Sequence, residues 1–154
     1  MLSLYKREME FYVSSELDCE KMILSMYSSD FVGRIQIFKS EYKNARTDFL
    51  VLNKENLKSF VVETKDWLKK EPTFISVSKI INCKKHYSGN GILILSHKQK
   101  YYWLDILKID WENVKTIKIP NKNDADYDLC YDIEILLSTN MEELSNVLLL
   151  RLLT

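Results

Sequence analysis

The chain ends in the segment STNMEELSNVLLLRLLT, and leucine occupies most of the circumference of the helix that this segment predicts. Thr139 and Glu142 have the spacing of a capping box, which marks the start of a helix. A helix that is apolar all round has to be covered. The rest of the chain must therefore supply a large apolar surface, and we expect helix 140–153 to lie on a sheet. The alternative is that part of this helix forms the contact of a homodimer.

Several strand-forming runs can supply such a surface. They are rich in β-branched and aromatic residues, and short polar turns separate many of them, so we expect mostly antiparallel pairing. In chain order these runs are GRIQIFKSE, DFLVLN, TFISVSKII, GILILSH, KYYWLDIL, ENVKTIKIP and CYDIEILL.

Two further helices are predicted, over residues 15–27 and 54–71. Asn53 can cap the second helix and Pro72 closes it. Its apolar positions fall at helical spacing, and they include Leu57, Phe60, Val61 and Leu68. Together these elements predict a single α+β domain over residues 1–154, in which a mostly antiparallel sheet packs with about three helices.

The composition bounds the functional classes. Basic and acidic residues are equal in number, 22 each, so no overall charge indicates nucleic acid or membrane as a partner. Three widely spaced cysteines are typical of reduced thiols in a cytosol. The N-terminal pattern differs from that of a signal peptide, and no run reaches the length of a membrane span. We therefore expect a cytoplasmic protein that does not associate with membranes.

The charge is unevenly distributed along the chain. Residues 79–122 hold nine lysines and three acidic residues, whereas residues 123–154 hold seven acidic residues and one arginine. The simpler interpretation is that these two segments pair in the folded sheet and cancel. The alternative is that the fold displays two surfaces of opposite sign.

The segment NKNDADYDLCYDIE begins like a calcium loop, because Asp124, Asp126 and Asp128 occupy alternate positions. Such a loop also needs Gly at its sixth position and Glu at its twelfth. Here those positions are Leu129 and Ile135. We therefore expect an exposed loop between two strands, without bound metal.

Two other segments contain residue types that could bind zinc or nucleic acid. Cys83 and His86 form a Cys-x-x-His pair, but the remaining ligands of a zinc site have no recognised spacing. We expect no cofactor. The segment HKQKYYWLD combines Lys98 and Lys100 with aromatic residues that could stack on nucleic-acid bases. Strand alternation sends Tyr101 and Tyr102 to opposite faces, however, so nucleic-acid binding is kept as an alternative only.

A metal-dependent nuclease of the carboxylate–carboxylate–lysine type could use Asp48 together with Glu63-Thr64-Lys65. That chemistry needs Glu63 and Lys65 to project together from one strand towards a metal ion. In the predicted helix 54–71, residues two apart do not share a face. The sequence therefore argues against this arrangement, and a nuclease is kept as the alternative function.

One family resemblance lies at the C-terminus. The segment DIEILLSTNMEELSNVLLLRLL, from Asp132 to Leu153, resembles the closing strand, Ser/Thr-x-x-Glu-Glu-Leu turn and Leu-rich helix of some contact-dependent-inhibition immunity proteins. Those bacterial proteins bind and block a toxin domain that a neighbouring cell delivers. They often have Gly after the Leu where this chain has Ser145. The resemblance implies a protein-binding function without catalysis.

The acidic segment suits such a function. A toxin that cuts nucleic acid has a basic active site, which an inhibitor can occupy with carboxylates. We therefore expect a cytosolic immunity protein that binds a basic, nuclease-like toxin domain and has no catalytic residues. Asp132 and Glu134 should extend the negative surface, because strand alternation places both on one side. The expected partner-binding residues are Asp124, Asp126, Tyr127, Asp128, Asp132 and Glu134.

Overall fold

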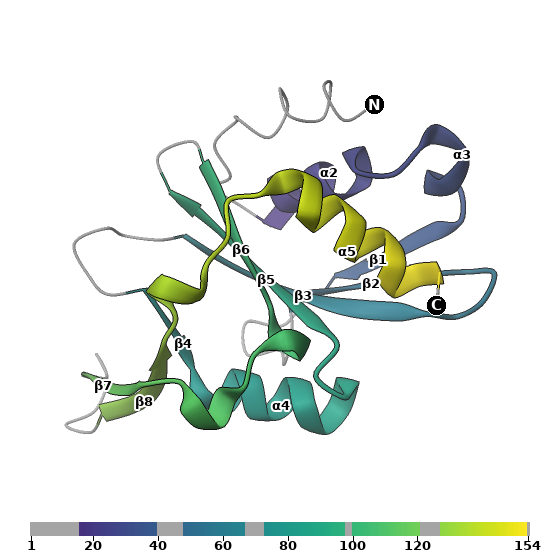
Figure 1. The fold of residues 1–154 in the computed structure, drawn as a ribbon. Coiled ribbons are helices and arrows are strands. Elements are labelled where there is room, and N and C mark those ends of the chain that lie inside the picture. Colours follow the sequence, from purple (N-terminus) through teal and green to yellow (C-terminus); the bar gives the residue numbers. More distant parts are fainter. Residues whose placement is uncertain (1–15, 40–47, 67–72, 98–99, 121–126, 154) are drawn as a thin grey trace.

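The computed structural model describes residues 16–39, 48–66, 73–97, 100–120 and 127–153. Its larger sheet has five strands in the order β1-β2-β3-β5-β6 (Figure 1). The strands are β1 (Ile35–Lys39), β2 (Phe49–Asn53), β3 (Ser59–Asp66), β5 (Gly91–His97) and β6 (Lys100–Asp105).

The strand pairs of this sheet are antiparallel, except that β3 and β5 run parallel. Parallel neighbours need a crossover connection, and helix α4 (Val77–Tyr87) lies in it. The smaller sheet is antiparallel, with the order β4-β8-β7, and it consists of β4 (Phe74–Ser76), β8 (Tyr127–Asp132) and β7 (Thr116–Pro120).

The other helices flank these sheets. They are α2 (Glu16–Ser25), α3 (Ser29–Val32) and α5 (Met141–Leu153), with the 3₁₀ turns η1 (Ile106–Lys108), η2 (Trp111–Asn113) and η3 (Glu134–Leu136). The predicted α+β class with mostly antiparallel sheets is confirmed, and α2 and α5 match the helices predicted at 15–27 and 140–153.

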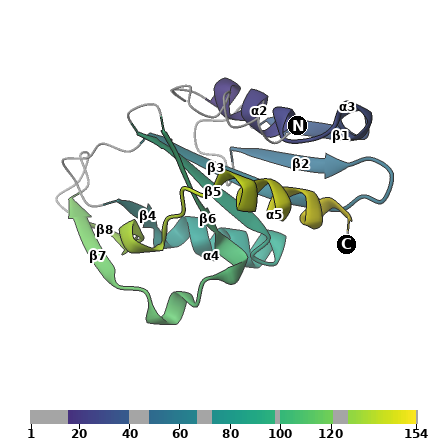
Figure 2. The same ribbon diagram turned by 45° about the horizontal axis from the view of Figure 1, so that its top comes forward.

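Apolar side chains pack on both faces of the larger sheet. Helices α2 and α5 cover one face and α4 covers part of the other (Figures 1 and 2). Leu144, Leu148 and Leu152 of α5 are fully buried, so the prediction that this helix lies on a sheet is confirmed. On the opposite face, Ile80 of α4 packs in a cluster that includes Val61 of β3.

The start of α5 differs from the prediction by one residue. Asn140, not Thr139, caps the helix, since its Oδ1 accepts a hydrogen bond from Glu143 N at 3.0 Å. Contacts with strand β6 explain this difference. Ser138 and Trp103 exchange two backbone hydrogen bonds of 2.9 Å, and the Trp103 indole donates to Asn140 O. These contacts fix where the chain leaves the sheet and therefore where the helix begins.

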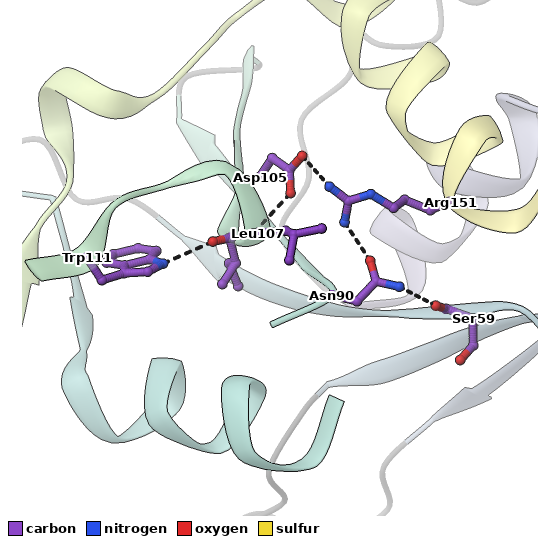
Figure 3. Close-up of polar contacts among 7 residues, drawn as sticks. Ser59, Asn90, Asp105, Leu107, Trp111 and Arg151 are labelled. Atoms are coloured by element: carbon purple, nitrogen blue, oxygen red, sulfur yellow. Dashed lines mark hydrogen bonds and ion pairs between the residues drawn. The ribbon is translucent and has the colours of Figure 1, made fainter. Parts of the chain in front are cut away.

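A polar network near the C-terminus joins α5 to the larger sheet (Figure 3). Arg151 pairs with Asp105 at the end of β6, and its Nη1 donates to Asn90 Oδ1 at 2.5 Å. Asn90 in turn donates to Ser59 O at 2.7 Å. The network therefore connects the ends of α5, β6 and β3.

The prediction of a helix over residues 54–71 is wrong, because residues 59–66 form β3, the central strand of the larger sheet. A strand buried on both faces has a continuous apolar run, which fits helical and strand periods alike. Leu57 lies in the preceding turn with φ 62 and is 71% exposed. Conversely, most of TFISVSKII belongs to α4 rather than to a strand.

Candidate functional site

Because residues 59–66 form a strand and not a helix, different side chains share a face among the residues that could serve nuclease chemistry. In a strand, side chains two residues apart leave on the same face, so Glu63 and Lys65 project together. The register of β2 and β3 pairs Phe49 with Val62. Continuing it by one residue places Asp48 opposite Glu63. The interpretation that Glu63 and Lys65 do not share a face is therefore wrong, because it depended on the helix.

Asp48 is fixed by its neighbour strand. Its Oδ2 accepts hydrogen bonds from Thr64 N at 2.6 Å and from Thr64 Oγ1 at 3.1 Å. Two bonds to one oxygen set the orientation of the carboxylate beside Glu63. Thr64 thereby contributes to the site, although its position on β3 directs it to the opposite face.

Glu63 is the buried carboxylate of the site, with 6% of the residue exposed. Burial raises the pKa of Glu63 to about 7; Lys79 lowers this pKa and Asp48 raises it. Lys79 Nζ lies 3.2 Å from Glu63 Oε2. A second carboxylate this close makes Glu63 hard to ionise, so a positive charge placed between Asp48 and Glu63 would be strongly stabilised.

Two lysines serve the site in different ways. Lys65 donates from Nζ to Phe74 O at 2.6 Å, and the same nitrogen lies 3.5 Å from the centre of the Phe74 ring. The smaller sheet thus holds Lys65 through β4. Lys79 comes from the first turn of α4, and 38% of its side chain is exposed. Neither Lys79 nor Phe74 was predicted for this site, because both lie in the run predicted as one strand.

The arrangement suits one kind of metal ion better than others. Among the residues that the structure describes, no three or more His, Cys, Asp or Glu side chains form a metal-binding group. Mg²⁺ is commonly bound by one or two protein carboxylates, with water and substrate phosphates completing its octahedron. Asp48 and Glu63 fit that requirement. Burial, together with the charge of Glu63, raises the pKa of Cys83 to about 11, so this thiol is a poor zinc ligand.

The predicted partner-binding residues lie elsewhere, and Asp124 and Asp126 fall outside the described part of the chain. Asp128 is exposed, but it belongs to β8 and not to a loop, so its predicted setting is wrong. Tyr127 is 62% exposed. Neighbouring residues of a strand point to opposite faces, so Tyr127 and Asp128 present themselves to different surroundings.

The predicted strand over CYDIEILL also ends early. Strand β8 stops at Asp132, and Glu134 begins the turn η3. Asp132 Oδ1 accepts a hydrogen bond from Glu134 N at 3.3 Å, which favours a turn at this point. Ile135, which follows Glu134 in this turn, is 94% exposed. Asp132 and Glu134 nevertheless line one pocket of about 250 Å³ together with residues 113–115.

Comparison with known proteins does not identify a relative of this chain, so its function has to be inferred from the geometry. No protein-family model matches the chain, and no curated protein or solved structure shows significant similarity to it. None of the helices in the described ranges is long and apolar enough to span a bilayer.

Proposed function

We propose that this protein is a metal-dependent nuclease that hydrolyses phosphodiester bonds. The observation that carries the proposal is the placement of Asp48 and Glu63 opposite each other on adjacent strands, with Lys65 on the same face and Lys79 beside Glu63. Two carboxylates on one face of a sheet, with a lysine ammonium beside them, are what the carboxylate–carboxylate–lysine chemistry requires.

Each residue has a role in this proposal. Asp48 and Glu63 would hold a divalent cation, which would supply Lewis-acid activation of the phosphate and of an attacking water. Thr64 keeps Asp48 oriented. A lysine ammonium stabilises the negative charge that develops on the phosphate. The buried position of Glu63 strengthens its attraction for the cation, because fewer water molecules screen its charge.

The helix beside the site is basic. Lys84, Lys85 and His86 form the last turn of α4 and are exposed, and Lys79 in the first turn contacts Glu63. Such a helix attracts nucleic acid of any base sequence, because its positive charges interact with the phosphates. Nucleic acid is therefore the phosphodiester that the surroundings favour.

A cleavage assay tests the proposal. Purified protein is incubated with single- and double-stranded DNA and RNA in Mg²⁺ or Mn²⁺, with EDTA as the metal-free condition. We expect metal-dependent cleavage that falls by about 100-fold or more in Asp48→Asn and Glu63→Gln, since each removes a ligand charge. Glu134→Gln, an exposed carboxylate remote from β3 in sequence, is the matched control and should retain activity. Cleavage that persists in both site variants would contradict the proposal.

A second candidate is a protein-binding module, for which we propose the immunity function that the C-terminal resemblance implies. The supporting observation is Ile135, which is 94% exposed and lines the same pocket as Asp132 and Glu134. An apolar anchor with carboxylates around it suits a basic protein partner.

Co-purification distinguishes this second candidate. The probe is the product of the gene immediately upstream, because immunity genes follow their toxin genes. We expect Ile135→Asp to abolish the complex and Leu57→Asp to preserve it. Leu57 is 71% exposed but lies in the turn before β3, so it controls for an added surface charge. Lack of a complex with the unaltered protein would count against the immunity function.

A further inference from the structure

Lys79 pairs with Glu63, one of the two carboxylates proposed to hold a divalent cation. We propose, resting on the nuclease function above, that Lys79 occupies the cation's place at Glu63 in the metal-free protein and moves aside when the cation binds. The displaced ammonium then contacts the phosphate of the nucleic acid. Lys79, from α4, is thus the catalytic lysine, and Lys65 is a fixed structural charge.

The Lys79 ammonium and a divalent metal ion compete for the Glu63 carboxylate. Lys79 Nζ lies 3.2 Å from Glu63 Oε2, and Glu63 is nearly fully buried. A Mg²⁺ ion binds carboxylate oxygen at about 2.1 Å and keeps water molecules around it. An ammonium and a dication at this one oxygen repel each other, so a cation bound at Oε2 favours the withdrawal of Lys79.

Lys79 is free to withdraw whereas its helix is not. Its side chain is 38% exposed and has four rotatable bonds, so it can turn towards solvent. Helix α4 is held by Ile80 and Cys83, both buried. Cys83 packs so close to Gly91 of β5 that a methyl group at Gly91 would lie 2.8 Å from its sulfur. The ammonium can therefore move by a few ångströms while its anchor stays beside Glu63.

Lys65 is less able to serve. Its Nζ donates to Phe74 O at 2.6 Å and lies over the Phe74 ring at 3.5 Å. A lysine that leaves these contacts gives up a hydrogen bond and a cation–π interaction together. Lys79 would give up only its contact with Glu63, which the incoming cation replaces.

Metal binding without nucleic acid tests the first half of the proposal. Mn²⁺ is titrated calorimetrically at about pH 8.5 into the unaltered protein, Lys79→Gln and the control Lys84→Gln, an exposed lysine on the same helix. We expect Lys79→Gln to bind Mn²⁺ about tenfold more tightly, because no ammonium has to be displaced. Lys84→Gln should match the unaltered protein.

Cleavage at saturating Mn²⁺ tests the second half. We expect kcat to fall by about tenfold or more in Lys79→Gln despite its tighter metal binding, and to recover in part in Lys79→Arg, which restores a positive charge. Lys65→Gln, with Mn²⁺ saturating, should lose less kcat than Lys79→Gln.

The outcomes separate the two proposals. If the unaltered protein neither binds Mn²⁺ nor cleaves nucleic acid, the nuclease function is overturned and this inference with it. If it does both, but Lys79→Gln binds Mn²⁺ no more tightly, only the displacement by metal is overturned. Tighter binding with undiminished kcat would overturn the catalytic role of Lys79.

Discussion

Within the ranges that the structure describes, two buried carboxylates pair with cations, and they differ in the number of partners that hold them. Asp105 pairs with Arg151 and Glu63 pairs with Lys79, and 7% of each carboxylate side chain is exposed. The cations differ, since 13% of the Arg151 side chain is exposed against 38% for Lys79.

The Asp105 pair is part of a closed network (Figure 3). The second Asp105 oxygen accepts from Leu107 N at 3.1 Å, and Arg151 also donates to Asn90. Each charged group is thus held by at least two partners. Such saturation is typical of a structural ion pair.

The Glu63 pair is arranged differently. The Lys79 side chain is 38% exposed. The nearby carboxylate of Asp48 opposes the ionisation of Glu63. Evolution toward stability alone would relieve this repulsion, and strained charges are enriched at functional sites. Two equally buried carboxylates can therefore have different roles. The Glu63–Lys79 pair, which has fewer partners, is the candidate for chemistry.

The largest expected effect is on the structural pair. Arg151→Met should reduce the free energy of unfolding by about 3–5 kcal/mol, because it leaves Asp105 buried without a counter-charge. Lys79→Met should cost about 1 kcal/mol or less, because Glu63, whose pKa burial raises to about 7, can take up a proton when its ammonium partner is removed. Urea denaturation of both variants measures the difference. Similar costs would break the distinction between the two pairs.

Next in size is the effect of pH on Glu63. Its pKa is raised from 4.5 to about 7 by burial, so the folded state holds more protons than the unfolded state between these values. Stability should therefore fall as the pH rises through this window, by up to about 3 kcal/mol. Glu63→Gln should be more stable than the unaltered protein at about pH 8 and lose less stability between pH 5 and 8.

The control for this prediction is Glu134→Gln, which removes an exposed carboxylate and should leave the pH profile of the melting temperature unchanged. If Glu63→Gln were instead less stable at pH 8, the Glu63–Lys79 pair would be a structural pair like that of Asp105.

A smaller effect is expected where α4 meets β5. A methyl group at Gly91 would lie 2.8 Å from Cys83 Sγ and 3.1 Å from a Val61 methyl. Gly91→Ala should therefore cost about 1–3 kcal/mol through overpacking. Added to Cys83→Ala, which removes the sulfur, the same substitution should cost clearly less. Urea midpoints of the four proteins in this cycle measure the coupling, and additive costs would show that Cys83 does not limit the approach of α4.

The smallest effect is expected for the acidic segment. Replacing Asp124, Asp126 and Asp128 with Asn should shift the melting temperature by about 1 °C or less, because exposed charges contribute little to stability. If the segment meets a basic partner, association should slow most at low salt. Unaltered binding to the upstream gene product at low salt would remove these residues from an interface. A large fall in melting temperature would show that they support the fold.

The sequence alone determined the α+β class, the mostly antiparallel pairing, and the burial of one face of the leucine-rich helix. Its other face stays exposed at Leu149, Leu150 and Leu153. These features are local, since hydrophobic period and turn residues lie within one stretch of chain. The sequence also placed Asp48, Glu63 and Lys65 on one candidate list, because their types suit a nuclease.

Only the tertiary structure decided that these residues lie together. The run around Val61 and Val62 is buried on both faces, so its pattern could not separate strand from helix, and pairing with β2 and β5 made it a strand. That choice brings Asp48 opposite Glu63. The parallel crossover then carries Lys79 back over β3 to within 3.2 Å of the same carboxylate. Contacts across a crossover depend on how layers pack, and no spacing in the sequence encodes them.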